Sequence, residues 1–461
     1  MIQKSPRTTR TSRQLRSVCS VFLAALAVSA ADRKAAVDQL VQPVIETGAA
    51  AGVVVGVIEG GKSQVFGYGK GAGEHVPDTS SIFEIGAVTK TFTTTALAAM
   101  VQQKMVALED PVRTYLPADA VPPGEAGRPE IRLIDLATQH SSLPGLPGNL
   151  RPKDPQNPFA DYTPQLLYEF LGKQTLRRTP NPTFIFSYLG MGLLGHALSL
   201  RYGKPYEQMI TELVTTPLGM PDTRVTLSAD QQGRLAPGHD PDGKPVHNWD
   251  FDALAGSRAL RSTGGDLARY VQAQIDPPEK LKGAIDLTHV ERQKMGAVGS
   301  IALAWLIKPD GKTYWQDGGT AGYTSYVSFN TEHKTGVVVL LCSFGVLSSQ
   351  IGERLEHMLA GEAVQPLPLH RAVTLDSKAL DEYVGAYEIV PGARLNLTRQ
   401  GEQMFVQIPG QGLLHLYPEA KDKFFVRIVD AVITFDRDEK GQIVSCVLHQ
   451  NGRDRQAKRV P

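Results

Sequence analysis

The stretch "FEIGAVTKTFTTTALAAM", residues 83–100, places a lysine at the head of a helix rich in small residues. Lys90 follows Ala87 by three positions, a spacing that puts both side chains on one helix face, one turn apart. A serine at position 87 could pass its proton to the lysine amine and become a nucleophile. The methyl group of Ala87 cannot attack a carbonyl. The sequence therefore keeps the base of an acyl-transfer site and lacks its nucleophile.

Without a serine, Lys90 has two other readings. A desolvated lysine of lowered pKa can act as a base or form a Schiff base with a carbonyl compound. In the alternative reading, Lys90 only hydrogen-bonds carbonyl groups and is a structural relic.

The 461-residue chain has the composition of a globular protein, with 42% hydrophobic residues and a formal net charge of +1. This length predicts two or three domains. The near-zero net charge does not indicate a basic surface for nucleic acid or an anionic membrane, so we expect no nucleic-acid partner. No run of about 18 apolar residues follows the N-terminal region, so no transmembrane helix is expected in the mature chain. We expect neither a metal nor a cofactor, and the oligomeric state stays open.

The N-terminus predicts a secretory signal peptide over residues 1–30. Four arginines between residues 7 and 16, without acidic residues, precede the apolar run "SVCSVFLAALAVSAAD", which ends in small residues. We expect cleavage near Ala30 or Ala31 and a periplasmic or secreted location. A buried N-terminal helix is the alternative interpretation.

The elements that position Lys90 begin with a hairpin, "GVVVGVIE" and "SQVFGYG", joined by a glycine turn. Apolar residues at helical spacing follow through the middle of the chain. Strands return in "IALAWLI", "TYWQDGG", "GYTSYVSFN" and "GVVVLLC", and the helix "SSQIGERLEHMLAG" comes next. Strands at both ends of a helical middle predict an α/β fold, in which an antiparallel sheet flanked by helices brings the two ends together.

A second unit is expected at the C-terminus. We place a proline-containing, unpatterned linker at residues 363–379, between a first domain over residues 32–362 and a second over residues 380–461. Short alternating runs from "LDEYVGAYEI" to "IVSCVLHQ" predict a small antiparallel barrel that folds apart from the first domain. Cys342 and Cys446 lie in apolar runs, which favours buried free thiols over a disulfide.

These stretches resemble the serine β-lactamase and penicillin-binding-protein-like family, in its class C and DD-peptidase-like branch. They are most similar to exported members with a C-terminal lipocalin-like β-domain. The resemblance covers nearly the whole mature chain, including "FEIGAVTKTFTTTALA", "LEDPVRTYLP", "GMGLLGHALSLRYGKPYEQMI", "TPLGMPDT", "LRSTGGDLARY" and "DGGTAGYTSYVSFN". It implies a β-lactamase/DD-peptidase-like fold and a serine hydrolase site. Fold does not fix function, so the catalytic elements are compared residue by residue.

The family pairs a serine with a lysine one helical turn later, and Ala87 and Lys90 occupy these positions. Its second element is a Tyr-x-Asn turn, whose tyrosine relays protons and whose asparagine binds the substrate amide. In the register set by "GMGLLG", these positions are Phe186 and Tyr188, and Phe186 lacks the hydroxyl that proton transfer needs. In a register shifted by two residues, Tyr188 is the working phenol.

The third element is a strand motif, Lys-Thr-Gly or His-x-Gly, whose cation helps to bind a substrate carboxylate. "YWQDGGTAGY" matches that strand, with neutral Gln316 at the cation position, followed by Asp317 and Gly318. Thr320 completes the set of ligand-binding residues that the resemblance implies. With an anion at position 317, the site is expected to repel carboxylates weakly. A literal Lys-Thr-Gly at residues 334–336 leads straight into a strand, and we interpret it as a turn.

Two smaller departures lie nearby. Where relatives read His-Thr-Ser-Gly-Leu-Pro-Gly, this chain reads "QHSSLPG", with Gln139 in place of histidine and Ser142 in place of glycine. The stretch "ALAGSRALRST" places Ser257 and Arg258 where small residues are common. We expect Arg258 to reach solvent rather than crowd the pocket.

Three functions fit these residues. The first is a pseudoenzyme that binds a small-molecule or peptide-like ligand, because nucleophile, phenol and cation are lost together; in subtilisin, loss of the nucleophile alone lowers turnover by roughly six orders of magnitude. The second is an enzyme in which Lys90 works with Tyr188 or Asp317 as acid or base partner. The third is a serine hydrolase (a β-lactamase, D-peptidase or esterase) in an inactivated form.

Overall fold

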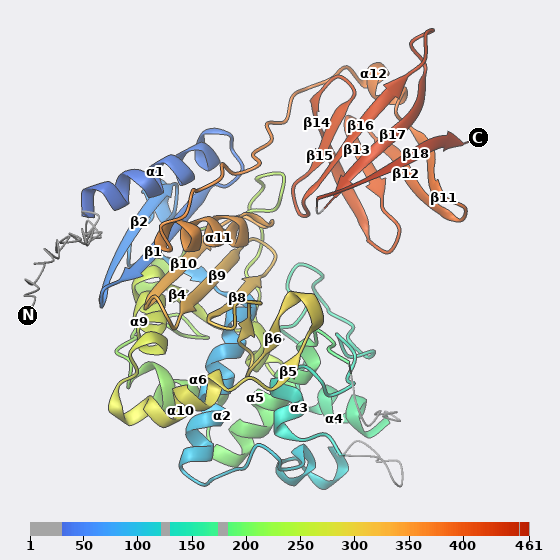
Figure 1. The fold of residues 1–461 in the computed structure, drawn as a ribbon. Helices are drawn as coiled ribbons and strands as arrows, with labels where there is room; N and C mark the ends of the chain where they lie inside the picture. The colour runs from blue at the N-terminus through green and yellow to red at the C-terminus, as the bar shows by residue number, and fades with distance from the viewer. Residues whose placement is uncertain (1–29, 121–129, 174–182, 451, 461) are drawn as a thin grey trace, which may run out of the picture.

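The computed structural model describes residues 30–120, 130–173, 183–450 and 452–460. Apart from Ala30, the expected signal peptide lies outside these residues. Figure 1 shows a helix-and-sheet unit that runs from blue to orange and a C-terminal barrel in red.

An antiparallel sheet of eight strands joins the two ends of the first unit, in the order β2-β1-β10-β9-β8-β7-β6-β5. The first strand is a near-continuous apolar run buried between two neighbours, with Val55 opposite both Val339 and Phe66. The predicted α/β fold is confirmed. The strands are β1 Gly52–Glu59, β2 Lys62–Gly69, β5 Gln293–Lys294, β6 Ser300–Ile301, β7 Leu306–Ile307, β8 Thr313–Gly319, β9 Thr324–Asn330 and β10 Thr335–Leu341.

The prediction of a single strand in "IALAWLI" is wrong. The segment forms two short strands, β6 and β7, which pair with each other. Ala304 between them has φ of +63°, a left-handed conformation that strands do not contain. Lys334 of the literal Lys-Thr-Gly lies in the turn between β9 and β10, as predicted.

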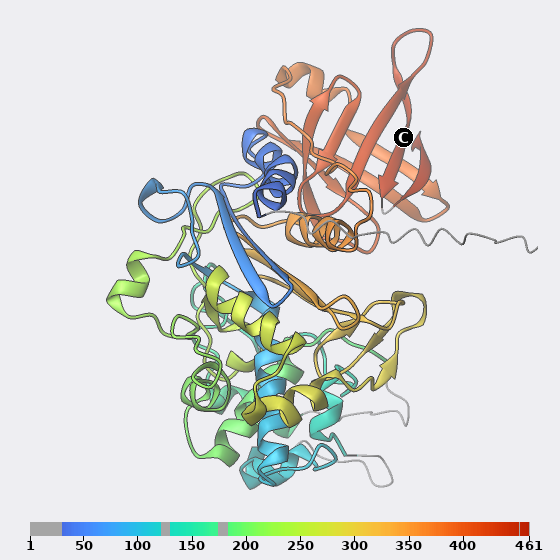
Figure 2. The ribbon, with the colours of Figure 1, turned by 60° about the vertical axis from the view of Figure 1, so that its left-hand side comes forward.

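Helices cover both faces of the sheet. Helices α1 and α11 pack on the face that Figures 1 and 2 show toward the barrel, and their apolar residues form one core with β1, β9 and β10. The larger core lies on the opposite face, around α2, α5 and α9. Among the described residues, no helix has the length and apolar character needed to cross a membrane. The helices of the first unit are α1 Ala30–Glu46, α2 Thr89–Gln102, α3 Leu133–Ala137, α4 Pro164–Lys173, α5 Tyr188–Tyr202, α6 Tyr206–Ile210, α7 Ala229–Gly233, α8 Ala255–Arg258, α9 Gly264–Ile275, α10 Glu279–His289 and α11 Leu347–Leu359.

The C-terminal unit is a closed antiparallel barrel, as the alternating runs predict. Its last strand, β18, was not expected, and "LDEYVGAYEI" begins in a short helix, α12, rather than in a strand. Cys342 and Cys446 are buried free thiols. The elements are α12 Ser377–Asp381, β11 Gly385–Val390, β12 Ala393–Gln400, β13 Gln403–Gln407, β14 Leu413–Ala420, β15 Lys423–Val426, β16 Ala431–Arg437, β17 Ile443–Gln450 and β18 Arg453–Val460.

The barrel contacts the first unit at a turn that contains Asp242. The Tyr417 hydroxyl donates to Asp242 Oδ1 over 2.5 Å, and His415 Nδ1 lies 2.9 Å from the same oxygen. The Arg427 guanidinium donates to the Pro241 carbonyl. These contacts join the two units through polar groups of β14 and the turn after β15.

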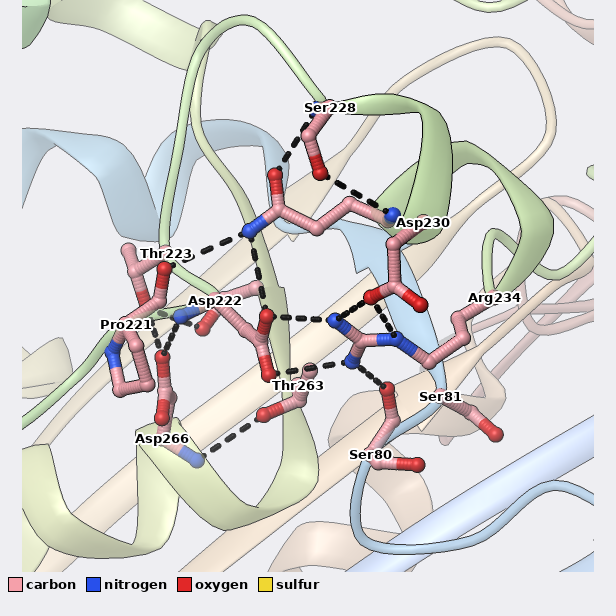
Figure 3. A network of polar contacts seen from close by, with 12 residues as sticks. Ser80, Ser81, Pro221, Asp222, Thr223, Ser228, Asp230, Arg234, Thr263 and Asp266 are labelled. Atoms are coloured by element: carbon pink, nitrogen blue, oxygen red, sulfur yellow. Dashed lines mark hydrogen bonds and ion pairs between the residues drawn. The ribbon is translucent and has the colours of Figure 1, made fainter.

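A polar network holds the strand that leads to residue 87 (Figure 3). Arg234 donates to the Ser80 carbonyl over 2.8 Å and to Asp222 over 2.6 Å. The Asp222 N–H donates to Asp266, in the first turn of α9, where the Thr263 hydroxyl caps the helix. The network thereby fixes the start of β3 (Ile82–Glu84), which pairs with β4 (Arg261–Thr263).

Candidate ligand-binding cleft

Ala87 lies where a short 3-10 turn runs into α2, directly against the end of β8. A Cβ atom on Gly86 would lie 2.4 Å from the Gly319 nitrogen, and one on Gly318 would lie 2.8 Å from the Ala87 nitrogen. Gly86 also has φ of +49°, so this close approach requires glycine. The first N–H groups of a helix have no intrahelical partner. The Ala87 N–H thus lies beside the backbone of Gly318 and Gly319, at the position where the side chain is a methyl group.

Lys90 is the second residue of α2 and is buried, with 2% of its surface exposed. Its Nζ lies 3.4 Å from the centroid of the Phe186 ring. Among the described residues, no carboxylate oxygen lies within 4.0 Å of this nitrogen. Burial lowers the pKa of Lys90 well below its usual value, and the charge of Arg258 lowers it further, while Asp317 raises it. The environment therefore favours the neutral amine.

Phe186 covers Lys90 on the solvent side, with 43% of its surface exposed. It precedes Ser187, which caps α5 by accepting a hydrogen bond from the Gly190 N–H over 2.9 Å. The Ser187 N–H donates to Gln139 Oε1 over 2.6 Å, which ties this turn to the "QHSSLPG" loop. The ring of Phe186, and not the phenol of Tyr188, therefore stands against Lys90.

Arg258 is buried against Tyr188, so the expectation that it reaches solvent is wrong. Its exposed fraction is 8%, its guanidinium carbon lies 4.1 Å from the Tyr188 ring centroid, and it donates to the Gly319 carbonyl. Two aromatic faces and a carbonyl replace part of the lost hydration, a role that the flat, weakly hydrated guanidinium suits. Helix α8 also packs closely on α5, since a Cβ on Gly256 would lie 2.8 Å from the Gly195 Cα.

The predicted residues of β8 have separate environments. The Gln316 amide donates to the Ala304 carbonyl over 2.7 Å and is buried. Asp317 accepts from the Ser349 hydroxyl over 3.3 Å, and burial raises the pKa of its carboxyl, while Arg258 lowers it. Thr320 is 1% exposed, and its N–H donates to the Tyr323 carbonyl over 3.0 Å. Gln316 and Thr320 are thus bonded into the fold and away from solvent.

The structure brings together Ala87, Lys90, Phe186 and Gly318, with Tyr188 and Asp317 joined to them through Arg258. Sequence reasoning missed two contacts. The Ser349 hydroxyl reaches Asp317 from the first turn of α11, and Phe159 stacks on Tyr188 at 5.6 Å between ring centroids. Both contacts join segments far apart in the chain, and no local spacing signals them.

We expect Ser142→Gly to raise the free energy of unfolding by about 0.5–1 kcal/mol. Ser142 has φ of +64°, a left-handed conformation that costs a non-glycine residue roughly 1–2 kcal/mol, partly offset by the larger backbone entropy of glycine in the unfolded chain. Urea denaturation of both proteins measures the difference. Ser141→Gly is the matched control: Ser141 has no positive φ, so a gain there of the same size would contradict this explanation.

Two family profiles and several known proteins match this chain. The Beta-lactamase family profile matches residues 37–360, and that of a domain of unknown function, DUF3471, matches residues 369–459. The D-alanyl-D-alanine-carboxypeptidase/endopeptidase AmpH of Escherichia coli (strain K12) is 34% identical over 242 residues, which are 52% of this chain and 61% of that protein. The matched region therefore spans less than two thirds of AmpH. Penicillin-binding protein 4* of Bacillus subtilis (strain 168) is 25% identical over 431 residues, 86% of this chain and 91% of that protein.

Two solved structures share the fold of the first unit. A class C beta-lactamase superposes with a TM-score of 0.63 at 23% identity, over 72% of this chain and 98% of that one. The beta-lactamase/D-alanine carboxypeptidase from Yersinia pestis, complexed with citrate, gives a TM-score of 0.62 at 24% identity, over 72% of this chain and 100% of that one. At these identities the likeness establishes the fold alone.

Proposed function

We propose, from the premise that the chain belongs to the Beta-lactamase family, that it is a non-hydrolytic protein that binds a small-molecule or peptide-like ligand in the family's cleft. The observation that carries this proposal is the methyl group of Ala87, held between a helix N-terminus and the end of β8 where the nucleophile must stand. The pattern of residues 1–30 further supports export to the periplasm or the medium.

Two other features of the cleft support binding without turnover. Lys90 faces a phenylalanine ring, which cannot relay a proton. Strand β7 pairs with β8 only at Tyr314 and Trp315, so the β7 side of β8 from residue 316 onward is free of strand pairing. A peptide-like ligand can bond to such an edge, and Arg258 already occupies its last carbonyl, that of Gly319. The peptidase names of relatives such as AmpH agree with a peptide-like ligand.

The purified protein is expected to form no stable adduct with a fluorescent penicillin or a fluorophosphonate. Both reagents need an activated serine, and Ala87 offers none. Intact-mass spectrometry measures the adduct, with the Ala87→Ser variant as the control that restores a possible acceptor. A stoichiometric adduct on the unaltered protein, mapped by peptide digestion to the cleft, would overturn the proposal.

A second candidate function rests on Lys90 itself, a buried amine of lowered pKa that has no carboxylate of the described residues within 4.0 Å. Its neutral nitrogen can attack an aldehyde carbon, and the carbonyl oxygen leaves as water to give an imine. Asp317, whose carboxyl pKa is raised by burial, and Tyr188 are the nearby proton donors. Incubation with a small aldehyde and borohydride tests this: a mass increase on Lys90, absent in Lys90→Met, supports imine chemistry, and no increase rejects it.

A further inference from the structure

Arg258 is a buried cation whose nearby anion, Asp317, forms no ion pair with it among the described residues. It is 8% exposed, and within the described part of the chain no ion pair includes its guanidinium. Among the described residues its Nε has no hydrogen-bond partner, and the guanidinium bonds to neutral acceptors, the Gly319 carbonyl and the Tyr188 hydroxyl. Arg261, three residues later, is 6% exposed but lies 3.3 Å from Glu84 and 2.9 Å from Asp250. Since a buried charge without a close partner is costly, Arg258 is the one of these two arginines that has no described carboxylate at ion-pair distance.

Basic groups surround Arg258. The Phe186 ring lies 3.4 Å from Lys90 Nζ and 5.6 Å from the Arg258 guanidinium carbon, so both basic side chains approach one aromatic side chain. The N-terminal turn that contains Ala87 contributes the positive end of a helix dipole. Asp317 is the nearby acid, and it is held by Ser349. Hydrogen-bond donors, with Arg258 among them, therefore gather around Phe186.

We propose that Arg258 takes over the task of the strand cation that Gln316 has replaced, and binds the carboxylate of the ligand. A guanidinium is a planar fork of donors that matches a carboxylate. The ligand class is thus a small peptide-like carboxylate, whose body packs on Phe186 and Tyr188. This inference rests on the proposed ligand-binding function, and it reverses the expectation that the site repels carboxylates.

The test compares a peptide acid with its amide by isothermal titration calorimetry. N-acetyl-D-alanyl-D-alanine and its C-terminal amide share one body and differ in charge. The unaltered protein is expected to bind the acid roughly 10- to 100-fold more tightly, the range of one charge-assisted hydrogen-bonded contact. Arg258→Gln should remove this preference, so that the acid and the amide bind with similar affinity. Arg258→Lys should keep part of the preference, because it retains the charge and loses the fork.

Arg371→Gln is the matched control, since Arg371 is exposed in the segment between α11 and α12 and should change neither affinity. Thermal unfolding of each variant verifies that it is folded. Equal affinity of the unaltered protein for acid and amide would overturn the role of Arg258 while ligand binding stands. Binding of neither compound would overturn both this inference and the proposed peptide-like ligand.

Discussion

The single change Ala87→Ser is expected to leave hydrolysis at least about two orders of magnitude below that of a variant in which the surrounding groups are also restored. Lys90, with its lowered pKa, can accept the serine proton. Phe186 supplies no proton for the leaving group, and general acid–base groups are typically worth about two to four orders of magnitude. Gln316 supplies no charge, and Arg258 occupies the Gly319 carbonyl. Such groups act as a unit and not additively.

Three variants separate these contributions on a chromogenic β-lactam and a short D-amino-acid ester. They are Ala87→Ser alone, the quadruple variant that adds Phe186→Tyr, Tyr188→Asn and Gln316→His, and the quintuple variant that also adds Arg258→Gly. We expect the single variant to accumulate a slowly hydrolysed acyl adduct, visible by intact mass. Turnover should rise strongly in the quadruple variant and again when Arg258 is removed.

The unaltered protein and Arg258→Gly alone are the controls, and both should be inactive because they lack a nucleophile. Family-like turnover by Ala87→Ser alone would contradict the assignment of Phe186 to the phenol position. Tyr188 would then be the working phenol, and the interpretation as a serine hydrolase in inactivated form would replace the pseudoenzyme.

The parts of the fold with local signals were predictable from the sequence. Strand β1 has a near-continuous apolar run followed by a glycine turn, so its hairpin with β2 follows from the chain alone. Strand β18, "RDRQAKRV", has one buried apolar residue, Ala457. This strand closes the barrel between β17 and β11. Pairing with neighbouring strands determines that position, and the local sequence pattern does not.

The site divides in the same way. The spacing of Ala87 and Lys90 is a property of one helix and could be seen in the sequence. The position of the Arg258 side chain depends on the packing of α8 on α5 and on the two aromatic rings of Phe186 and Tyr188. The periodicity of the sequence does not encode these contacts. An arginine among small residues reads as a solvent-exposed side chain until those partners are known. The long-range part of the site was therefore the part that sequence reasoning assigned wrongly.

We expect Lys90→Met to raise the free energy of unfolding by about 1–4 kcal/mol near pH 7, the range seen when buried charged groups are replaced by apolar ones of similar volume. Burial lowers the pKa of Lys90 in the folded protein, while the unfolded chain keeps a pKa near 10.5. Between these two pKa values the unfolded state binds more protons, so the stability of the unaltered protein falls as the pH decreases through this window. The advantage of the methionine variant should therefore be large near neutral pH and should shrink as the pH approaches 10.5.

Urea denaturation at about pH 7 and at the highest pH at which unfolding stays reversible measures this difference. Lys62→Met on β2 is the control, because Lys62 is exposed and its replacement should give a small change at both pH values. A loss of stability in Lys90→Met near pH 7 would mean that Lys90 is charged in the folded state and held by the Phe186 ring. A gain would mean that the fold retains the Lys90 amine at a cost in stability, which is common for functional residues. Such a gain, together with imine trapping on Lys90, would favour chemistry at this lysine; a gain without trapping would leave Lys90 as a relic of the family's base beside the ligand site.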